Sequence, residues 1–233
     1  MAQAADLSSP SGSVFSHPSF MLIRHAEPPD LQALVRIYNQ AIASGGQTAD
    51  MTPVTIGDRR AWFDSHTTGE ASGLYPLFVA ELNGEVAGYL YLSPYRQGRE
   101  ALRSVAEISY YVDQQYLRRG VASALMQHVM EGFRSRSAVP GPQHESVNTW
   151  HAFKTLIAIL LGTNGPSIAF LKKHGFSQWG CMPGVAEISN MQVNGSSPHH
   201  GTGSGVENTE TTSVPQSVAK VDHLYYGLRL CEQ

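Results

Sequence analysis

The chain has 233 residues, of which 42% are apolar, and this supply is ample for the core of one domain. Lys plus Arg number 16 and Asp plus Glu number 19, so the net charge is −3, which argues against a generic nucleic-acid binder with its strong basic excess. No apolar run approaches the roughly 18 residues of a membrane span. The two cysteines, Cys181 and Cys231, cannot form a disulfide framework, and we expect free thiols in the cytoplasm.

Three segments lack the patterns of regular structure. Residues 1–20 have neither the basic nor the long apolar segment of a secretory signal and are expected to form a disordered tail. Residues 135–150 contain two prolines and are expected to form a surface loop. Residues 194–220 are rich in Ser, Gly, Thr and Asn, which predicts a disordered insertion, and its His199-His200 pair lacks the further ligands of a metal site. A single domain over 21–230 remains.

The first elements along the chain are a strand and two helices. Residues 21–25 form a short apolar strand candidate. Apolar side chains at helical spacing over 31–42 predict a helix, with Asp30 as its N-cap. A second helix is predicted over 56–66, with Thr55 as the capping residue.

A β-hairpin follows these helices. Two apolar runs, 77–80 and 86–92, are joined through Asn83-Gly84. This dipeptide favours a type I′ turn, in which both central residues have positive φ. The two strands are therefore antiparallel.

The second half of the chain predicts a βαβ unit. An alternating strand over 106–112 precedes an amphipathic helix over 122–133, and a strongly apolar strand over 155–161 comes next. Two strands connected in this way are parallel, with a right-handed crossover. A short helix from Asn164 to Gly175 and a last strand over 223–230 complete an α/β domain with a mixed sheet.

The segment Arg118-Arg-Gly-Val-Ala122 lies between a predicted strand and the start of a helix. Small residues there expose backbone N–H groups, and the helix dipole adds positive potential, so the segment could hold a pyrophosphate. The two arginines would add charged hydrogen bonds to phosphate oxygens. An ordinary tight turn with solvated arginines explains the same residues equally well.

Two motifs in this order resemble a known family. Arg118 to Leu125 is similar to the acetyl-CoA motif of the GCN5-related N-acetyltransferases (GNATs), and Asn164 to Phe176 is similar to their second motif. Within that family the chain most resembles the phosphinothricin acetyltransferase-like branch. That likeness rests on three further segments: 101–112, 48–53 and 222–226.

The resemblance implies a fold in which the two parallel strands splay apart and the pantetheine arm of acetyl-CoA enters between them. It implies that Val112 and its neighbours bind this arm through backbone groups, and that Asn164 contacts it near the thioester. The residues implied in wrapping the pyrophosphate are Leu117, Arg118, Arg119, Gly120, Val121, Ala122 and Ser123.

Two positions depart from the family pattern. Leu117 stands where relatives usually have Gln or Arg, which should weaken pyrophosphate binding without abolishing it, because most contacts there are made by backbone. Leu171 stands where relatives carry Tyr or His as the acid for the leaving thiolate, and leucine cannot donate a proton. We therefore assign no acid from the sequence.

Glu107 is the candidate catalytic base. It lies in a largely apolar strand, where a carboxylate is costly unless it is paired or functional. Desolvation would raise its pKa towards the range of a general base that accepts a proton from an ammonium group, and the resemblance places the family's proposed base at this position. The alternative is a structural carboxylate paired with a nearby arginine such as Arg103.

A candidate substrate pocket lies between the hairpin and the strand of Glu107. Arg96, Arg99 and Arg103 could recognise a carboxylate or phosphinate, and Tyr111 shares the strand face of Glu107. A solvated basic loop is the alternative for the arginines, and core packing is the alternative for Tyr111.

Together these features predict an N-acetyltransferase that uses acetyl-CoA as co-substrate and no metal. The expected acceptor is a small amino-acid-like amine of the phosphinothricin or methionine sulfone and sulfoximine type, acetylated by direct attack because no nucleophile with an adjacent base is visible. Acetylation of a protein N-terminus or lysine, and a non-catalytic acetyl-CoA-binding module, are the alternatives. We expect no nucleic-acid or membrane partner, and the resemblance implies a homodimer.

Overall fold

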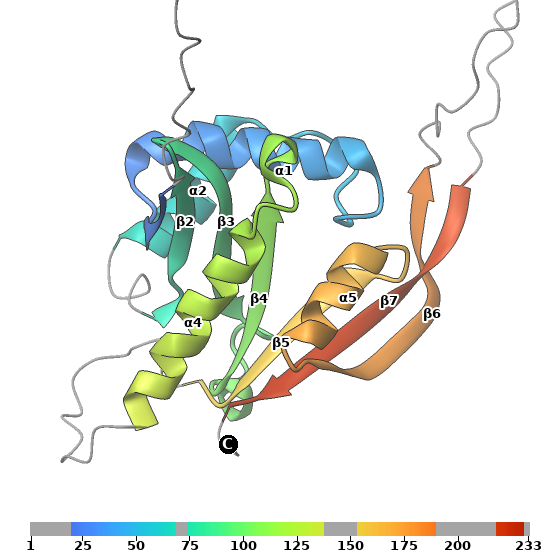
Figure 1. Cartoon of the computed structure of the whole chain (residues 1–233). Coiled ribbons are helices and arrows are strands. Elements are labelled where there is room, and N and C mark those ends of the chain that lie inside the picture. Colours follow the sequence, from blue (N-terminus) through green and yellow to red (C-terminus); the bar gives the residue numbers. More distant parts are fainter. Residues whose placement is uncertain (1–19, 69–73, 138–152, 190–217, 231–233) are drawn as a thin grey trace, which may run out of the picture.

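The computed structural model describes residues 20–68, 74–137, 153–189 and 218–230. Their strands form a seven-stranded sheet in the order β1-β2-β3-β4-β5-β7-β6 (Figure 1). Each neighbouring pair is antiparallel except β4 and β5, which are parallel. The mixed sheet predicted from the sequence is therefore confirmed, including the parallel pair of the βαβ unit.

The strands are β1 (Met21–His25), β2 (Leu77–Leu82), β3 (Glu85–Pro94), β4 (Val105–Val112), β5 (Thr155–Leu161), β6 (Ser177–Ser189) and β7 (Val218–Arg229). The α-helices are α1 (Leu31–Ser44), α2 (Ile56–Thr67), α4 (Val121–Ser137) and α5 (Gly165–Lys173). Three short 3-10 helices are η1 (Pro28–Asp30), η2 (Glu100–Leu102) and η3 (Gln114–Tyr116).

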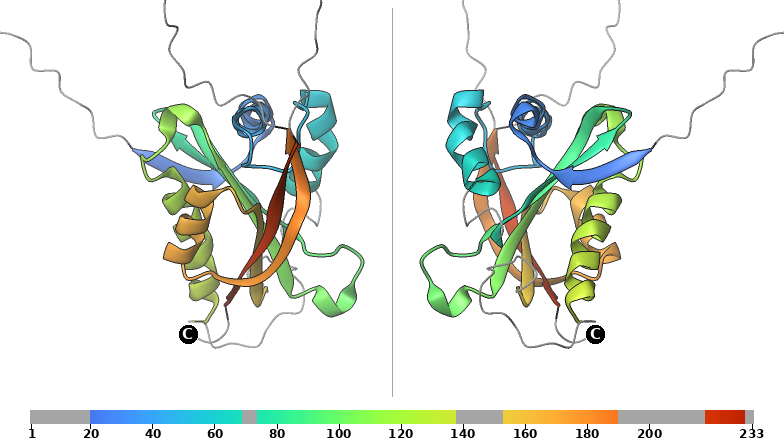
Figure 2. Two further views of the ribbon diagram at one scale, coloured as in Figure 1. Left: turned by 90° about the vertical axis from the view of Figure 1, so that its right-hand side faces the viewer. Right: turned by 90° about the vertical axis from the view of Figure 1, so that its left-hand side faces the viewer.

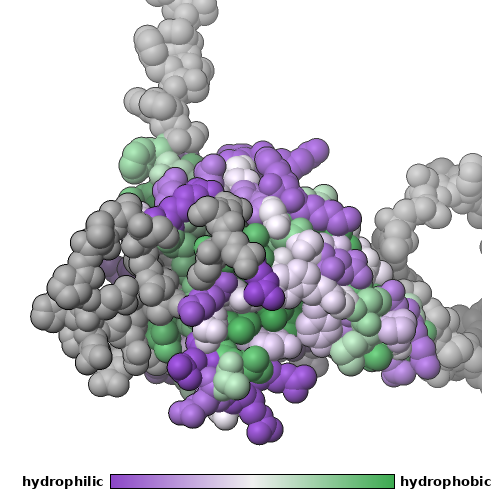
Figure 3. Space-filling model, turned by 90° about the horizontal axis from the view of Figure 1, so that it is seen from below, coloured by the Kyte–Doolittle hydropathy of each residue, from purple (hydrophilic) through white to green (hydrophobic). Residues whose placement is uncertain are grey.

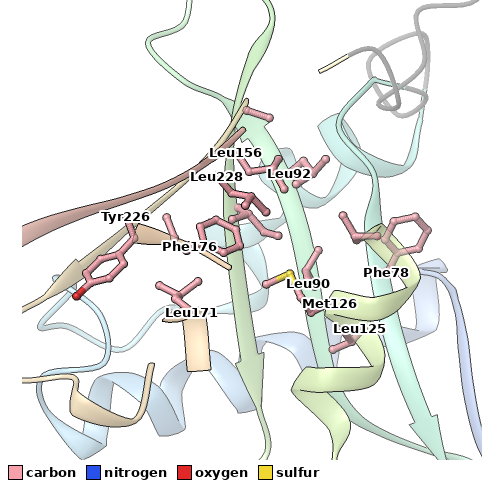
Figure 4. Close-up of a cluster of buried hydrophobic side chains, with 14 of the residues drawn as sticks. Phe78, Leu90, Leu92, Leu125, Met126, Leu156, Leu171, Phe176, Tyr226 and Leu228 are labelled. Atoms are coloured by element: carbon pink, nitrogen blue, oxygen red, sulfur yellow. The ribbon is translucent and has the colours of Figure 1, made fainter. Parts of the chain in front are cut away.

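The helices cover both faces of the sheet. Figure 2 shows α4 and α5 on one face and α1 and α2 on the other. The larger core cluster lies under α4 and α5 and joins side chains from most of the strands (Figure 4). Its labelled members are Phe78, Leu90, Leu92, Leu125, Met126, Leu156, Leu171, Phe176, Tyr226 and Leu228. The smaller cluster lies under α1 and α2 and includes Leu34, Ile37, Phe63, Val79 and Tyr89.

Two local predictions are confirmed by backbone geometry. The Thr55 side chain accepts a hydrogen bond from the Asp58 amide, and the Asp58 carboxylate bonds back to the Thr55 amide, so α2 begins with a capping box. Asn83 and Gly84 have φ of 55° and 84°, as a type I′ hairpin turn requires.

Asp30 is the N-cap residue of α1, as predicted, but its side chain does not cap this helix. Its carboxylate instead accepts hydrogen bonds from the Glu27 amide (2.7 Å) and from the Arg24 guanidinium (2.7 Å). Because η1 precedes α1 directly, Asp30 caps that earlier turn and ties it to β1.

The β6 strand was not predicted from the sequence, and the predicted boundaries of β7 and α4 differ from those in the structure. β6 pairs with β7 across two register irregularities, and β7 begins at Val218, inside the predicted 194–220 insertion. The α4 helix extends to Ser137, so the first three residues of the predicted 135–150 loop are helical. The rest of that loop, residues 190–217 and the tail before Phe20 lie outside the described residues.

Candidate functional site

The parallel strands β4 and β5 pair only at their beginnings. Their register covers three residue pairs and ends at Glu107 with Ile157, after which the strands separate (Figure 1). A groove lies in the fork, and its lining includes Tyr110, Asn164 and Leu171. The structure thus shows the splay that the resemblance implies.

The separation leaves one edge of β4 without a strand partner. The Asp113 amide donates to the carbonyl of Ala87 in β3, so odd-numbered residues of β4 direct their backbone groups towards β3. The Ser104 carbonyl, which accepts from the Thr155 amide, shows that even-numbered residues face β5. Beyond Glu107, the backbone groups of Ile108, Tyr110 and Val112 therefore face the groove. This edge could pair with an extended ligand as a further strand would.

The segment from Leu117 to Ser123 forms the turn that begins α4. Arg118 and Gly120 have φ of 59° and 84°, both in the left-handed region, and the helix begins at Val121. The Gly120 carbonyl accepts from the Ala124 amide, the first bond of the helix, so the amides of Val121, Ala122 and Ser123 are available to an anion. Leu117, Arg118 and Arg119 are exposed at this turn.

An ion pair between a buried carboxylate and a half-exposed arginine fixes the end of β4 against α1. Asp113 is fully buried, pairs with Arg36 of α1 and accepts a hydrogen bond from the Gln115 amide at 2.9 Å. Burial alone would raise the pKa of this carboxyl, but the Gln115 amide and the Arg36 guanidinium more than offset it and hold the pKa below its ordinary value. The pair positions the chain just before the turn at 117–123.

Asn164 lies at the other wall of the groove and caps α5. Its side-chain oxygen accepts from the Ser167 amide at 3.2 Å. Leu171, on the same helix, is buried in the core beneath the groove, as Figure 4 shows. Asn164 therefore lines the groove at the start of α5, and Leu171 offers no proton donor.

Glu107 lies where the fork opens. It is half-buried and shares its strand face with Ser109 and Tyr111, towards α1 and α2. Burial raises its pKa above the ordinary value. Within the described part of the chain Glu107 makes no ion pair, so the alternative of a structural pair with Arg103 is not what the structure contains.

The three candidate arginines lie together in the loop between β3 and β4. Arg96, Arg99 and Arg103 line one pocket of about 360 Å³, and all three are exposed. The loop extends on the same side of the sheet as α2, at the lower end of the molecule (Figure 2). Seen from below, this end of the molecule shows hydrophilic residues around smaller hydrophobic areas (Figure 3). Glu107 is not part of this lining, and Tyr111 lines the groove of the fork instead.

Sequence reasoning missed an arginine on α2. The Arg59 guanidinium lies over the rings of Tyr38, at 4.0 Å, and Trp62, at 4.6 Å. One of its nitrogens, Nη2, is buried and has no hydrogen-bond partner among the described residues. The Tyr38 hydroxyl in turn donates to Asp50 at 2.6 Å. No local pattern marks Arg59, because its neighbours come from separate elements.

Sequence comparison relates the chain to known acetyltransferases. The profile described as the acetyltransferase (GNAT) family matches residues 34–142. The Bacillus subtilis protein named "Putative phosphinothricin acetyltransferase YwnH" is 38% identical over 173 residues, which cover 74% of this chain and 93% of that protein. The chain belongs to the GNAT acetyltransferase family.

Other relatives agree with this assignment. The L-methionine sulfoximine/L-methionine sulfone acetyltransferase of Pseudomonas paraeruginosa is 30% identical over 180 residues, covering 74% of this chain and 93% of that enzyme. A solved structure titled as that of a "putative phosphinothricin N-acetyltransferase" superposes with a TM-score of 0.64 at 31% identity and covers 91% of this chain and 100% of its own. The resemblance noted in the sequence is confirmed.

This GNAT protein is an acetyl-CoA-dependent N-acetyltransferase. Its described residues contain no group of three or more His, Cys, Asp or Glu side chains that could hold a metal ion, and His199-His200 lies outside them. No helix in the same residues is long and apolar enough to span a membrane. Cys181 is a free, exposed thiol on β6, whereas Cys231 lies outside the described residues.

Proposed function

We propose that this N-acetyltransferase acetylates the amine of a small amino-acid-like substrate, of the phosphinothricin or methionine sulfone and sulfoximine type. The observation that carries the proposal is the half-buried, unpaired carboxylate of Glu107 at the mouth of the fork between β4 and β5. The names of the two relatives point to the same substrate class.

Glu107 is the general base in this proposal. The acceptor arrives as an ammonium ion and must lose a proton before its nitrogen can attack a thioester. Glu107 takes that proton directly or through water, and the nitrogen then bonds to the carbonyl carbon. The carbon–sulfur bond breaks with its electron pair on sulfur, and the nitrogen releases a second proton to solvent. Backbone N–H groups on the open edge near Val112 stabilise the oxyanion formed in between.

The turn from Leu117 to Ser123 binds the pyrophosphate of acetyl-CoA in this proposal. The features that fit an anion are the free amides of the first turn of α4, the dipole of that helix and the exposed Arg118 and Arg119. Val112 and its even-numbered neighbours bind the pantetheine arm along the open edge of β4, and Asn164 lies near the thioester.

Gly120→Ala is expected to weaken acetyl-CoA binding about tenfold. A side chain at φ of 84° costs about 1–2 kcal/mol, and relaxing that strain turns the neighbouring amides away from the phosphates. Gly84→Ala is a matched control, because Gly84 has the same φ, lies in a hairpin turn, and like Gly120 has nothing within 4 Å of the added Cβ. Calorimetry should show weaker binding only in the Gly120 variant; equal affinities in both variants would contradict this role.

The arginine loop orients the acid group of the substrate in this proposal. Arg103→Met should raise KM for amino-acid substrates about 10- to 100-fold, because one charged hydrogen bond contributes about 1.5–3 kcal/mol. The variant should leave KM nearly unchanged for amines that lack the acid group. Arg134→Met, an exposed change on α4 across the sheet, is the control. Equal losses for acidic and neutral amines would remove the loop from substrate recognition.

Release of free thiol from acetyl-CoA tests the proposal as a whole. The acceptors are phosphinothricin, methionine sulfone and methionine sulfoximine, with a lysine peptide and a peptide with a free N-terminus beside them. We expect release with at least one small acceptor and none with the peptides. Faster release with a peptide would favour the protein acetyltransferase, and binding of acetyl-CoA without any release would favour the non-catalytic module.

A further inference from the structure

The hydroxyl of Tyr110 is buried and makes no hydrogen bond of normal geometry with the described residues, although the Ser167 side chain lies close to it. An unsatisfied buried hydroxyl typically costs about 1–3 kcal/mol, so its position calls for a partner that a ligand could supply. Burial raises the pKa of Tyr110 to about 12, with a smaller opposing effect from the Ser167 side chain. The phenol is therefore protonated at neutral pH and can act as a hydrogen-bond donor.

Tyr110 belongs to the groove between the separated strands. Its backbone lies on the open edge of β4, and its ring packs against Phe170 of α5 at a centroid distance of 4.8 Å. Ser167, which lies beside the hydroxyl, also lines the groove. The side chain of Tyr110 thus stands between the open strand edge and α5.

The other polar groups of the groove are less suited to donate to a bound sulfur. The Asn164 oxygen accepts from the Ser167 amide, which leaves its NH2 group as a donor, and an amide N–H is less acidic than a phenol. Leu171 has no polar atom, and the remaining polar side chains in the lining are Gln47, Ser109, Ser167 and Tyr111. The ring of Tyr111 packs on the other face of the sheet, against Tyr38 and Tyr89. Among these side chains, Tyr110 combines a phenolic proton with complete burial of its oxygen.

We propose that the Tyr110 hydroxyl donates a hydrogen bond to the sulfur atom of acetyl-CoA that leaves during acetyl transfer. The inference rests on the proposed function, because it places the thioester in the fork. When the amine nitrogen has bonded to the carbonyl carbon, the carbon–sulfur bond breaks and its electron pair remains on sulfur. One proton of the ammonium group goes to Glu107 before the attack, and the nitrogen releases a second proton to solvent as the amide forms. The Tyr110 proton stays on oxygen while it is shared with the thiolate.

This arrangement has a measurable consequence for the product. A hydrogen bond to the charged form of an acid lowers its pKa, so the thiol of bound coenzyme A should ionise more readily than the free thiol, whose pKa is about 8.5. A charged hydrogen bond of about 1.5–3 kcal/mol corresponds to a shift of about one to two pH units. In the Tyr110→Phe variant this shift should be lost.

The experiment is a pH titration of thiolate ultraviolet absorbance in the complex with coenzyme A alone. Wild type, Tyr110→Phe and Tyr226→Phe are compared; Tyr226 is another buried tyrosine, and its hydroxyl bonds to Gln178 at 3.4 Å. We expect a lowered thiol pKa in wild type and in the Tyr226 variant, and a value near that of free coenzyme A in the Tyr110 variant. Turnover of Tyr110→Phe should fall about 10- to 100-fold with little change in the KM for the amine.

Two results would overturn the inference. One is a pKa of the bound thiol in wild type equal to that of free coenzyme A. This result is informative without any variant. The other is an equally lowered thiol pKa in wild type and Tyr110→Phe. The titration requires no acceptor amine, so it can be interpreted even if no amine of the substrate panel is acetylated. Failure of the Tyr110 inference is therefore distinguishable from failure of the proposed function. Because Tyr110→Phe removes an unpartnered hydroxyl, its melting temperature should not fall.

Discussion

Glu107→Gln is expected to lower kcat about 100- to 10,000-fold, the usual contribution of a general base. Glutamine keeps the size of the side chain but cannot take a proton from the ammonium group. Acetyl-CoA binding should be nearly unchanged, because the groove and the turn at 117–123 are intact. Since burial disfavours the charged carboxylate of Glu107, the melting temperature should not decrease.

The pH dependence of the same enzyme provides a second check on Glu107. Only the ionised carboxylate accepts a proton, and burial raises its pKa above the ordinary 4.5. Wild-type kcat/KM should therefore rise with pH through that raised pKa, and the residual activity of Glu107→Gln should lack this step. Equal activity of the two proteins at every pH would exclude Glu107 as the base.

Arg36→Met is expected to have the largest effect on stability, about 2–4 kcal/mol. It leaves the fully buried Asp113 carboxylate with the Gln115 amide but without its cation. Breaking a fully buried pair typically costs about 3–5 kcal/mol, and the cost is smaller here because the Arg36 side chain is 47% exposed. Denaturation with urea at pH 7 measures the loss.

The pH dependence of stability tests the same pair. The pKa of Asp113 is lowered in the folded protein, so its contribution is complete above the unfolded-state pKa near 3.9 and is lost as the pH falls through the lower folded value. The stability difference between wild type and Arg36→Met should therefore shrink in acid. The control is the double variant Arg36→Met/Asp113→Asn, which has no unpaired charge and should recover part of the loss. A single variant as stable as wild type would show that the pair does not anchor β4.

Much of the fold could be predicted because its signals are local. The capping box of Thr55 and the turn at Asn83-Gly84 each depend on a few neighbouring residues, and the βαβ unit follows from periodicity. The β6 strand gave no such signal, because Gly180, Pro183 and Gly184 interrupt it and it pairs with β7 across two irregularities. The side-chain partners of Asp30 were not foreseen, because Glu27 and Arg24 precede it, whereas the prediction considered only the helix that follows.

Prediction of the candidate-site residues likewise succeeded where the signals are local and failed where they are not. Glu107 and the turn at 117–123 were predicted because a carboxylate in an apolar strand and a glycine before a helix are visible in the sequence. Tyr110 and Arg59 were not identified as site residues, because their unpartnered polar atoms result from packing between separate elements. The sequence likewise could not show that the arginine pocket excludes Glu107.

The central claim is that acetyl-CoA occupies the open edge of β4 and the turn that begins α4. Amide hydrogen exchange, measured with and without coenzyme A, tests it most directly. The account predicts slower exchange in peptides covering 108–112 and 117–124, with little change in the arginine loop over 95–103. Protection confined to the arginine loop, or unchanged exchange over 108–112 at saturating coenzyme A, would contradict it.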